Sequence, residues 1–227
     1  MPKKQTTSLQ KDGFEILERF VNNDILEGIK DEINLYDTDF PKYGIRSAEK
    51  KFSNIDNLVN SELLVNKANK ILGAKPQVVR VIYFDKTEEN NWLVPWHQDR
   101  TIALSKKINV EGWGRWSVKD GVHHVQPSID VLDNMVTFRV HLDDSNRDNG
   151  CLKVISRTNT LGLLNKEQIQ AITSENSHEY CEVKAGDILL MRPHILHASS
   201  KGKEPKHRRI VHIEYSSYEL PLDVEWA

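Results

Sequence analysis

Apolar residues in the N-terminal third recur every three or four positions, which is the spacing of an amphipathic helix. Residues 24–34 follow this pattern behind Asn23 and Asp24, which can cap a helix. Residues 54–72 follow it too, and Gly73 provides a natural C-terminal stop. The remaining stretches of this part are predicted as a short strand at 13–17 and a loop at 37–51.

After residue 76 the pattern changes to that of short strands. Residues 77–84 are β-branched and aromatic, which favours a strand. Further strands are predicted at 94–99, 135–142, 151–155, 178–183, 187–191, 194–199 and 207–216, with a short helix at 165–175 and a tail at 218–227. Many short strands without strand–helix alternation predict a mainly β fold, a barrel or sandwich, with the N-terminal helices of residues 1–75 packed outside it.

Residues 100–134 interrupt the strands with weak periodicity and several glycines. Long loops inside a compact domain are usually functional or disordered. Trp113 and Trp116 argue against disorder, because disordered segments contain few aromatic residues. We therefore expect a lid or substrate loop here, with a merely structural insertion as the alternative.

Length and charge narrow the class of protein. A chain of 227 residues is most simply one large domain (1–227), with its β core at 76–217. A formal charge of −2, from 31 basic and 33 acidic residues, gives no drive toward nucleic acid or an anionic membrane. The expected partner is a small molecule or a protein.

The cysteines and the first residues point to the cytoplasm. Cys151 and Cys181 do not make a disulfide framework, which favours a reducing compartment. No apolar segment follows the basic residues at the start of the chain, and no run reaches the length of a transmembrane helix. A cytoplasmic location is expected.

Three pairs of a histidine and a carboxylate two residues on are candidates for metal binding. Two histidines and one carboxylate form the facial triad of non-haem Fe(II) sites, which leaves metal positions open. On a strand, residues i and i+2 share one face, so such a pair can hold one ion. The pairs are His97 with Asp99, His141 with Asp143, and His212 with Glu214.

The position of the third ligand favours the first pair. Four predicted strands separate His97 and Asp99 from His197, enough for the chain to wind round and bring them together. The second pair runs into an acidic turn and is interpreted as a structural histidine beside solvated carboxylates. The third pair has no histidine after it, so it cannot complete a triad in that order.

The closing ligand is chosen between His194 and His197. We prefer His197, because small residues follow it directly and leave room for a ligand. Arg208 lies eleven residues further on, where a guanidinium can pair bidentately with a dicarboxylate on the iron. Arg209 then points to the opposite face. The alternative is that both arginines are solvated.

Several of these motifs occur in the same order in a known family. They are Lys11-Asp12-Gly13-Phe14, Trp96-His97-Gln98-Asp99, Asp148-Asn149-Gly150-Cys151-Leu152, Gly186-Asp187, His197-Ala198-Ser199 and Arg208. Together they resemble the phytanoyl-CoA dioxygenase family of Fe(II)- and 2-oxoglutarate-dependent oxygenases. The resemblance implies a double-stranded β-helix (jelly-roll or cupin-like), iron on His97, Asp99 and His197, O₂ as cosubstrate, and 2-oxoglutarate at Arg208 and Ser199.

One departure from the family and one added stretch concern the ligand pocket. Where some members carry a Trp, this chain has Arg139, which either points inward to hold a carboxylate or forms a salt bridge on the outer sheet. Residues 112–127 resemble a stretch found in a bacterial-looking subgroup. Its polar and aromatic mix, which includes Lys119, can line a pocket. The substrate candidates are Trp113, Trp116, His123, His124, Gln126 and Lys86, with Tyr83 as a further cofactor contact and Trp92 as a weaker pocket residue. The adjacent histidines are alternatively solvent-facing.

The resemblance implies oxidative decarboxylation of 2-oxoglutarate to succinate and CO₂. Because Asp99 is present, where halogenating relatives lack the carboxylate, hydroxylation of a small molecule is expected, with desaturation or cyclisation as alternatives. A non-catalytic binding module and a zinc enzyme are the other classes. No basic, adenine-stacking cluster points to an acyl-CoA, so the substrate class and oligomeric state stay open.

Overall fold

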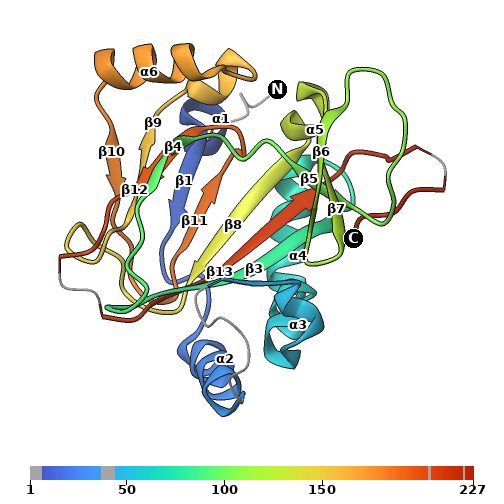
Figure 1. The fold of residues 1–227 in the computed structure, drawn as a ribbon. Coiled ribbons are helices and arrows are strands. Elements are labelled where there is room, and N and C mark those ends of the chain that lie inside the picture. The colour runs from blue at the N-terminus through green and yellow to red at the C-terminus, as the bar shows by residue number, and fades with distance from the viewer. Residues whose placement is uncertain (1–6, 37–43, 204–205, 222) are drawn as a thin grey trace, which may run out of the picture.

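The computed structural model describes residues 7–36, 44–203, 206–221 and 223–227. Two antiparallel sheets face each other in its core (Figure 1). The larger sheet has the order β1 (Phe14–Leu17), β11 (Ile188–Met191), β8 (Met135–His141), β13 (Arg208–Ser216), β3 (Gln77–Lys86) and β2 (Gly44–Arg46). The smaller has the order β10 (Glu179–Cys181), β9 (Leu152–Ile155), β12 (Leu196–Ser199) and β4 (Val94–His97).

The chain alternates between these sheets as it winds, and the predicted mainly β, double-stranded β-helix fold is confirmed. The strands lie close to their predicted positions. One boundary matters for the site: β4 ends at His97, so Asp99 lies outside the strand on which it was expected. The shared-face argument therefore does not explain its position.

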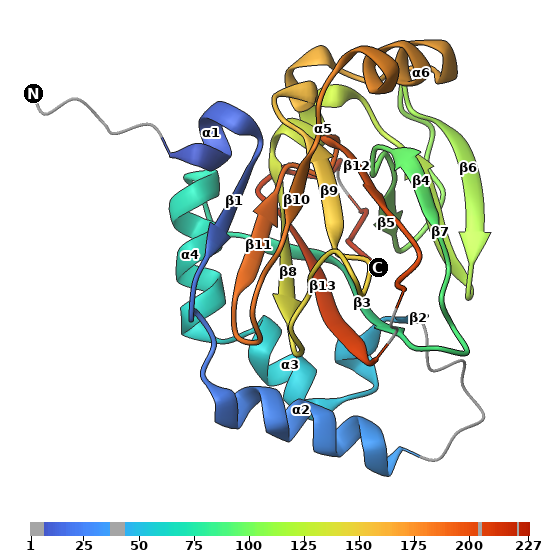
Figure 2. The same cartoon turned by 90° about the vertical axis from the view of Figure 1, so that its left-hand side faces the viewer.

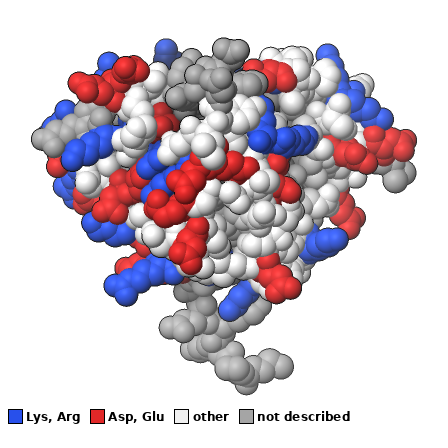
Figure 3. Space-filling view, turned by 90° about the horizontal axis from the view of Figure 1, so that it is seen from below, with Lys and Arg blue, Asp and Glu red and all other residues white. Residues whose placement is uncertain are grey.

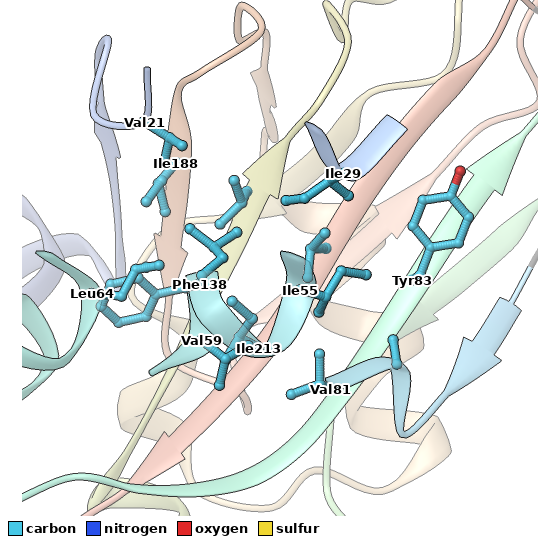
Figure 4. Close-up of a cluster of buried hydrophobic side chains, with 14 of the residues drawn as sticks. Val21, Ile29, Ile55, Val59, Leu64, Val81, Tyr83, Phe138, Ile188 and Ile213 are labelled. Carbon is cyan, nitrogen blue, oxygen red and sulfur yellow. The ribbon is translucent and has the colours of Figure 1, made fainter. Parts of the chain in front are cut away.

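The N-terminal helices cover the outer face of the larger sheet, as predicted (Figure 2). They are α1 (Ser8–Asp12), α2 (Asn23–Leu35), α3 (Ser53–Val59) and α4 (Glu62–Leu72). Ile29, Ile55 and Leu64 pack from the helices against Phe138 and Ile213 of the sheet (Figure 4). This buried layer is the largest hydrophobic cluster of the described residues.

Two N-terminal predictions need correction. The single helix expected at 54–72 is two helices, because the chain turns at Asn60 and the Ser61 side chain caps the next helix by accepting from the Leu64 backbone N–H. Part of the loop expected at 37–51 forms β2 and a 3₁₀ turn at Ala48–Lys50, whereas residues 37–43 lie outside the described part.

Residues 100–134 are not a loop but a third sheet, with the strand order β5 (Ile102–Leu104), β7 (Val122–Gln126) and β6 (Gly114–Lys119), followed by helix α5 (Ile129–Asp133). Figure 1 shows it on the right. Asp120 and Gly121 both have positive φ, 51° and 80°, as a two-residue hairpin turn of type I′ requires. The Asp120-Gly121 sequence is typical of such a turn, so the hairpin could have been predicted from the sequence. The predicted tail also bonds here, through a bridge from Trp226 to Leu104.

The remaining connection carries the predicted helix, α6 (Lys166–Glu175), after a 3₁₀ turn at Thr158–Leu161. Among the described residues, no helix is both long and apolar enough to span a membrane. The face seen in Figure 3 mixes basic and acidic side chains, in keeping with the net charge of −2.

Gly186 provides a test of the contact between the N-terminal segment and the sheet. Its φ is +88°, and an added Cβ would lie 2.7 Å from the Val21 carbonyl oxygen. We expect Gly186→Ala to lower the free energy of unfolding by about 3 kcal/mol, measured by urea denaturation. Gly73→Ala is the matched control, since Gly73 has a φ of +77° and no atom within 4 Å. It should cost about 1 kcal/mol. Equal losses would contradict the role of the close contact.

Candidate active site

The structure brings His97, Asp99 and His197 together at one end of the space between the two main sheets. In the pairing of β12 with β4, His197 lies directly opposite His97, and the two rings are 4.2 Å apart between centroids. The Asp99 carboxylate lies 3.6 Å from Nε2 of each histidine. One ligand atom of each residue falls within 4.8 Å of the other two, as a shared metal ion requires.

Backbone contacts hold Asp99 where the strand has already ended. Its N–H donates to the Pro193 carbonyl oxygen at 2.9 Å. The Gln98 side chain points away, as expected, and donates to the His194 carbonyl oxygen at 2.7 Å. It also accepts from the Leu164 N–H at 2.9 Å. This buried amide fixes the turn that carries Asp99 back toward the histidines.

The orientation of both histidines is set by the backbone. Nδ1 of His97 lies 2.9 Å from the Pro95 carbonyl oxygen, and Nδ1 of His197 lies 2.9 Å from that of Ile195. A carbonyl only accepts, so each Nδ1 carries a proton, and Nε2 is left as the atom of each ring that faces Asp99. Burial also lowers the pKa of His197 to about 3, which keeps the ring neutral.

The triad lines a cavity of about 230 Å³. Among the predicted site residues, the cavity is also lined by Arg139, Ser199, Arg208 and Trp92. Lys119, from the stretch expected to line the substrate pocket, and His212, from the third candidate pair, line it too. The lining residues that were assigned no role from the sequence are Arg46, Arg80, Ile82, Phe84, Val94, Thr101 and Leu152. A larger groove of about 500 Å³, beside β1, is lined by no histidine and is therefore not this kind of site.

A group of cations lies on one side of the triad. Lys86 and Arg208 are opposite each other in the pairing of β3 with β13, and both are buried. The Lys86 ammonium donates to Ser199 Oγ at 3.1 Å and to the Ser200 carbonyl oxygen at 2.8 Å. Arg208 donates to the Gly150 carbonyl oxygen at 2.7 Å. Burial, together with nearby arginines, lowers the pKa of Lys86 to about 7.

Arg139 points inward and belongs to a buried polar network. Its Nη1 lies 2.9 Å from Nδ1 of His212, and Nε2 of His212 lies 3.1 Å from the Glu214 carboxylate. The same carboxylate oxygen pairs with Arg80 at 2.5 Å. Because Arg139 only donates and Glu214 accepts, both ring nitrogens of His212 are already used.

This network also corrects an argument from chain order. Asp99, which comes earlier in the chain, completes a second cluster with His212 and Glu214, whose ligand atoms also lie within 4.8 Å of one another. Order along the chain was thus no ground for dismissing that pair. The bonds of His212 and Glu214 to two arginines leave the first cluster as the candidate metal site. His141 and Asp143 do not form such a cluster among the described residues, since Asp143 pairs with Arg209 at 2.7 Å.

Tyr83 is misassigned as a cofactor contact. Alternate residues of a strand face opposite sides, and Ile82 and Phe84 face the cavity. Tyr83 therefore packs among the helices on the other side (Figure 4). The same alternation places Arg80 and Lys86 on the cavity side. The alternation of side chains along this strand could have been read from the sequence, and it would have separated Tyr83 from the residues that face the cavity.

The residues expected to line the substrate pocket from 112–127 do not line this cavity. Trp113 and Trp116 pack in a separate cluster with the C-terminal segment, where Trp113 lies 6.4 Å from Tyr218 between ring centroids. His123 packs against Trp116, His124 is buried, and Gln126 pairs with Gly114. Of the residues named from this stretch, only Lys119, beside the hairpin turn, lines the cavity.

The two facing sheets and the cluster of two histidines and a carboxylate define a metalloenzyme of the double-stranded β-helix class. The family model described as phytanoyl-CoA dioxygenase matches residues 9–210, and the chain belongs to this family. It is an enzyme of the non-haem iron and 2-oxoglutarate-dependent class. No curated protein sequence matches the chain.

Solved structures share the fold at low sequence identity. AviO1 from Streptomyces viridochromogenes Tue57 is 18% identical, with a TM-score of 0.69 and 94% of each chain covered. HygX from Streptomyces hygroscopicus with nickel and 2-oxoglutarate bound is 14% identical, with a TM-score of 0.66 over 95% of this chain and 87% of that chain. The epimerase SnoN in complex with Fe³⁺, alpha ketoglutarate and nogalamycin RO is 12% identical, with a TM-score of 0.71 over 92% and 80%.

The pair of Arg80 and Glu214 can be tested by its effect on stability. Glu214→Ala leaves the Arg80 guanidinium buried without its partner, so we expect the free energy of unfolding to fall by about 3–5 kcal/mol. The double variant Arg80→Met/Glu214→Leu removes both charges and should lose less than the single variant. Urea denaturation of these two proteins and of the single variants Arg80→Met and Glu214→Leu provides the measurement. A double variant whose loss equals the sum of the losses of Arg80→Met and Glu214→Leu would contradict a coupled pair.

Proposed function

We propose that Fe(II) binds to Nε2 of His97, a carboxylate oxygen of Asp99 and Nε2 of His197. The separations support this fit. Ligand atoms that each lie about 2.1 Å from one ion, at angles of 90° to 120°, are about 3.0–3.6 Å apart. Oδ1 of Asp99 lies 3.6 Å from Nε2 of His97, and Oδ2 lies 3.6 Å from Nε2 of His197. One ligand atom of each residue lies within 4.8 Å of the other two, and this convergence is the observation that carries the proposal.

The cosubstrate 2-oxoglutarate fits the cationic side of the cavity. Its distal carboxylate would bind Arg208, with Ser199 as a hydroxyl contact. Lys86 does not line the cavity itself, but its ammonium donates to Ser199 Oγ and would act as a second cation directly behind this contact. Neither cation makes an ion pair with a carboxylate among the described residues. An incoming carboxylate thus supplies the counter-charge that these buried groups lack.

The proposed reaction is hydroxylation of a small molecule. When bound, iron and 2-oxoglutarate supply oxidising chemistry with O₂, which releases succinate and CO₂ and removes a hydrogen from the substrate. The protein holds the metal on one face through the triad and anchors the cosubstrate at Arg208. Asp99 occupies the position at which halogenating relatives lack a carboxylate, which favours hydroxylation. SnoN, which shares the fold, is named an epimerase, so proteins with this fold also catalyse reactions other than hydroxylation.

The cosubstrate site is tested by titrating the anaerobic Fe(II)-loaded protein with 2-oxoglutarate. We expect the visible charge-transfer band of an iron-bound keto acid, and we expect it to need at least tenfold more 2-oxoglutarate in Arg208→Ala. Arg209→Ala is the matched control, because Arg209 lies on the other face and pairs with Asp143. Asp99→Ala should abolish the band through loss of iron. An iron-loaded protein without a band would overturn the oxygenase proposal.

The position of Lys86 makes 2-oxoglutarate binding depend on pH. Its pKa is lowered to about 7 by burial and by Arg208 and Arg139, with Cys151 acting in the opposite direction. The ammonium is therefore charged below about pH 7 and neutral above it, and an anion binds the charged form. We expect the dissociation constant to rise by up to about tenfold per pH unit above 7.

The same titration, run between pH 6 and 8.5, provides the measurement. Lys86→Met should bind 2-oxoglutarate weakly at every pH and with a flat profile. The same slope in this variant as in the unmodified protein would show that another group titrates.

A further inference from the structure

The cavity carries more positive charge than iron and 2-oxoglutarate require. Five cationic side chains line it, and Asp99 is the one carboxylate among the lining residues. Behind the wall, Glu214 neutralises Arg80. Fe(II) and the dianionic cosubstrate cancel each other's charge. A net positive charge therefore remains for another ligand to balance.

The unused cations gather at the cavity mouth, away from the cosubstrate anchor. Arg46 ends β2 at the edge of the larger sheet, and Lys119 ends β6 at the hairpin turn. The two elements meet where Arg46 pairs with Asp120 at 3.3 Å. The exposed fractions of these two side chains are 39% and 66%, so the pair is screened by water and neutralises Arg46 only weakly.

Lys119 is the most available of these cations. Its side chain makes no ion pair or hydrogen bond within the described part of the chain. Partial burial and the charges of Arg46 and Arg80 lower its pKa, which shows that the three cations lie in one electrostatic neighbourhood. Lys86, in contrast, is influenced by Arg208 and Arg139. The cations around the cavity thus fall into two electrostatic groups, one of Arg46, Arg80 and Lys119 and one of Lys86, Arg139 and Arg208.

The rest of the lining limits the ligand's size and character. The uncharged part of the wall is largely apolar, formed by Ile82, Phe84, Trp92, Val94 and Leu152. A cavity of about 230 Å³ must also hold 2-oxoglutarate, which leaves room for a small body only. A bound oxyanion at the mouth would direct that body along the apolar wall toward the triad.

We propose that the substrate is a small organic acid whose oxyanion group, a carboxylate or a phosphate, binds Lys119 and Arg46 at the cavity mouth. Guanidinium and ammonium groups side by side suit either oxyanion. The inference rests on the proposed function, because it takes the opposite cationic group as the cosubstrate anchor. Lys119 and Arg46 act as specificity-determining residues.

The test uses the anaerobic complex of the full chain with Fe(II) and 2-oxoglutarate. Isothermal titration calorimetry compares matched probes: hexanoate with hexanamide, benzoate with benzamide, and hexyl phosphate with hexanol. We expect at least one acid to bind tenfold or more tightly than its neutral partner. The carboxylates and the phosphate ester distinguish the two kinds of oxyanion. If no acid binds, or if acids and neutral partners bind equally, the inference is wrong.

Charge variants separate recognition from stability. Lys119→Gln should reduce the preference for the acid to threefold or less, and Lys119→Glu should make hexylamine bind better than hexanoate, which a structural role would not do. Arg46→Gln should also weaken acid binding. Lys70→Glu on the exposed face of α4 is the matched control and should change nothing. An unchanged acid preference in Lys119→Glu would overturn the assignment.

The charge-transfer band distinguishes the two proposals. It should persist in the Lys119 and Arg46 variants, since neither residue contacts the cosubstrate anchor. If the unmodified protein shows no band, the proposed function is wrong. If it shows the band but does not prefer acids, only this further inference is wrong.

Discussion

The pairing of β12 with β4 is the constraint on which the site depends. It sets His197 opposite His97, and β12 is also paired along its other edge, where His197 lies opposite Val154 of β9. A slip of one residue would turn either histidine to the opposite face of the sheet. Because ladders on both edges hold β12, the backbone fixes the distance between the two rings before any metal binds.

The distribution of apolar surface explains how a charged site can occupy the space between two sheets. In most sandwiches the facing sides of the sheets form the hydrophobic core. Here the helices cover the outer face of the larger sheet, and that layer holds the main core. In β13, Val211 and Ile213 face the helices, whereas Arg208, His212 and Glu214 face inward. The side chains of the hydrophobic core and those of the candidate site thus lie on opposite faces of the same strands.

The charged side chains that face the space between the sheets differ in whether they have a partner of opposite charge. Arg80 and Glu214 pair with each other, and Arg139 is bonded to His212. Lys86 and Arg208 bond to neutral oxygens and lack a carboxylate partner among the described residues. Buried cations of this kind raise the free energy of the empty protein. An anionic ligand relieves that cost, so binding and stabilisation of the fold are coupled.

The sequence by itself determined the class of fold, because strand and helix periodicity are local properties. It also determined the candidate metal ligands, because the motifs that carry them occur along this chain in the same order as in the family. Strand parity on β3, visible in the sequence, would also have excluded Tyr83 and indicated Arg80. Only the tertiary structure decided which charges share the cavity. Arg46 and Asp120 lie more than seventy residues apart and pair because the edge of the larger sheet meets the hairpin turn, which brings Arg46 and Lys119 to one cavity. No local pattern encodes that contact. Trp113 and Trp116 are likewise placed by tertiary packing, in a cluster with the C-terminal segment and not in the cavity.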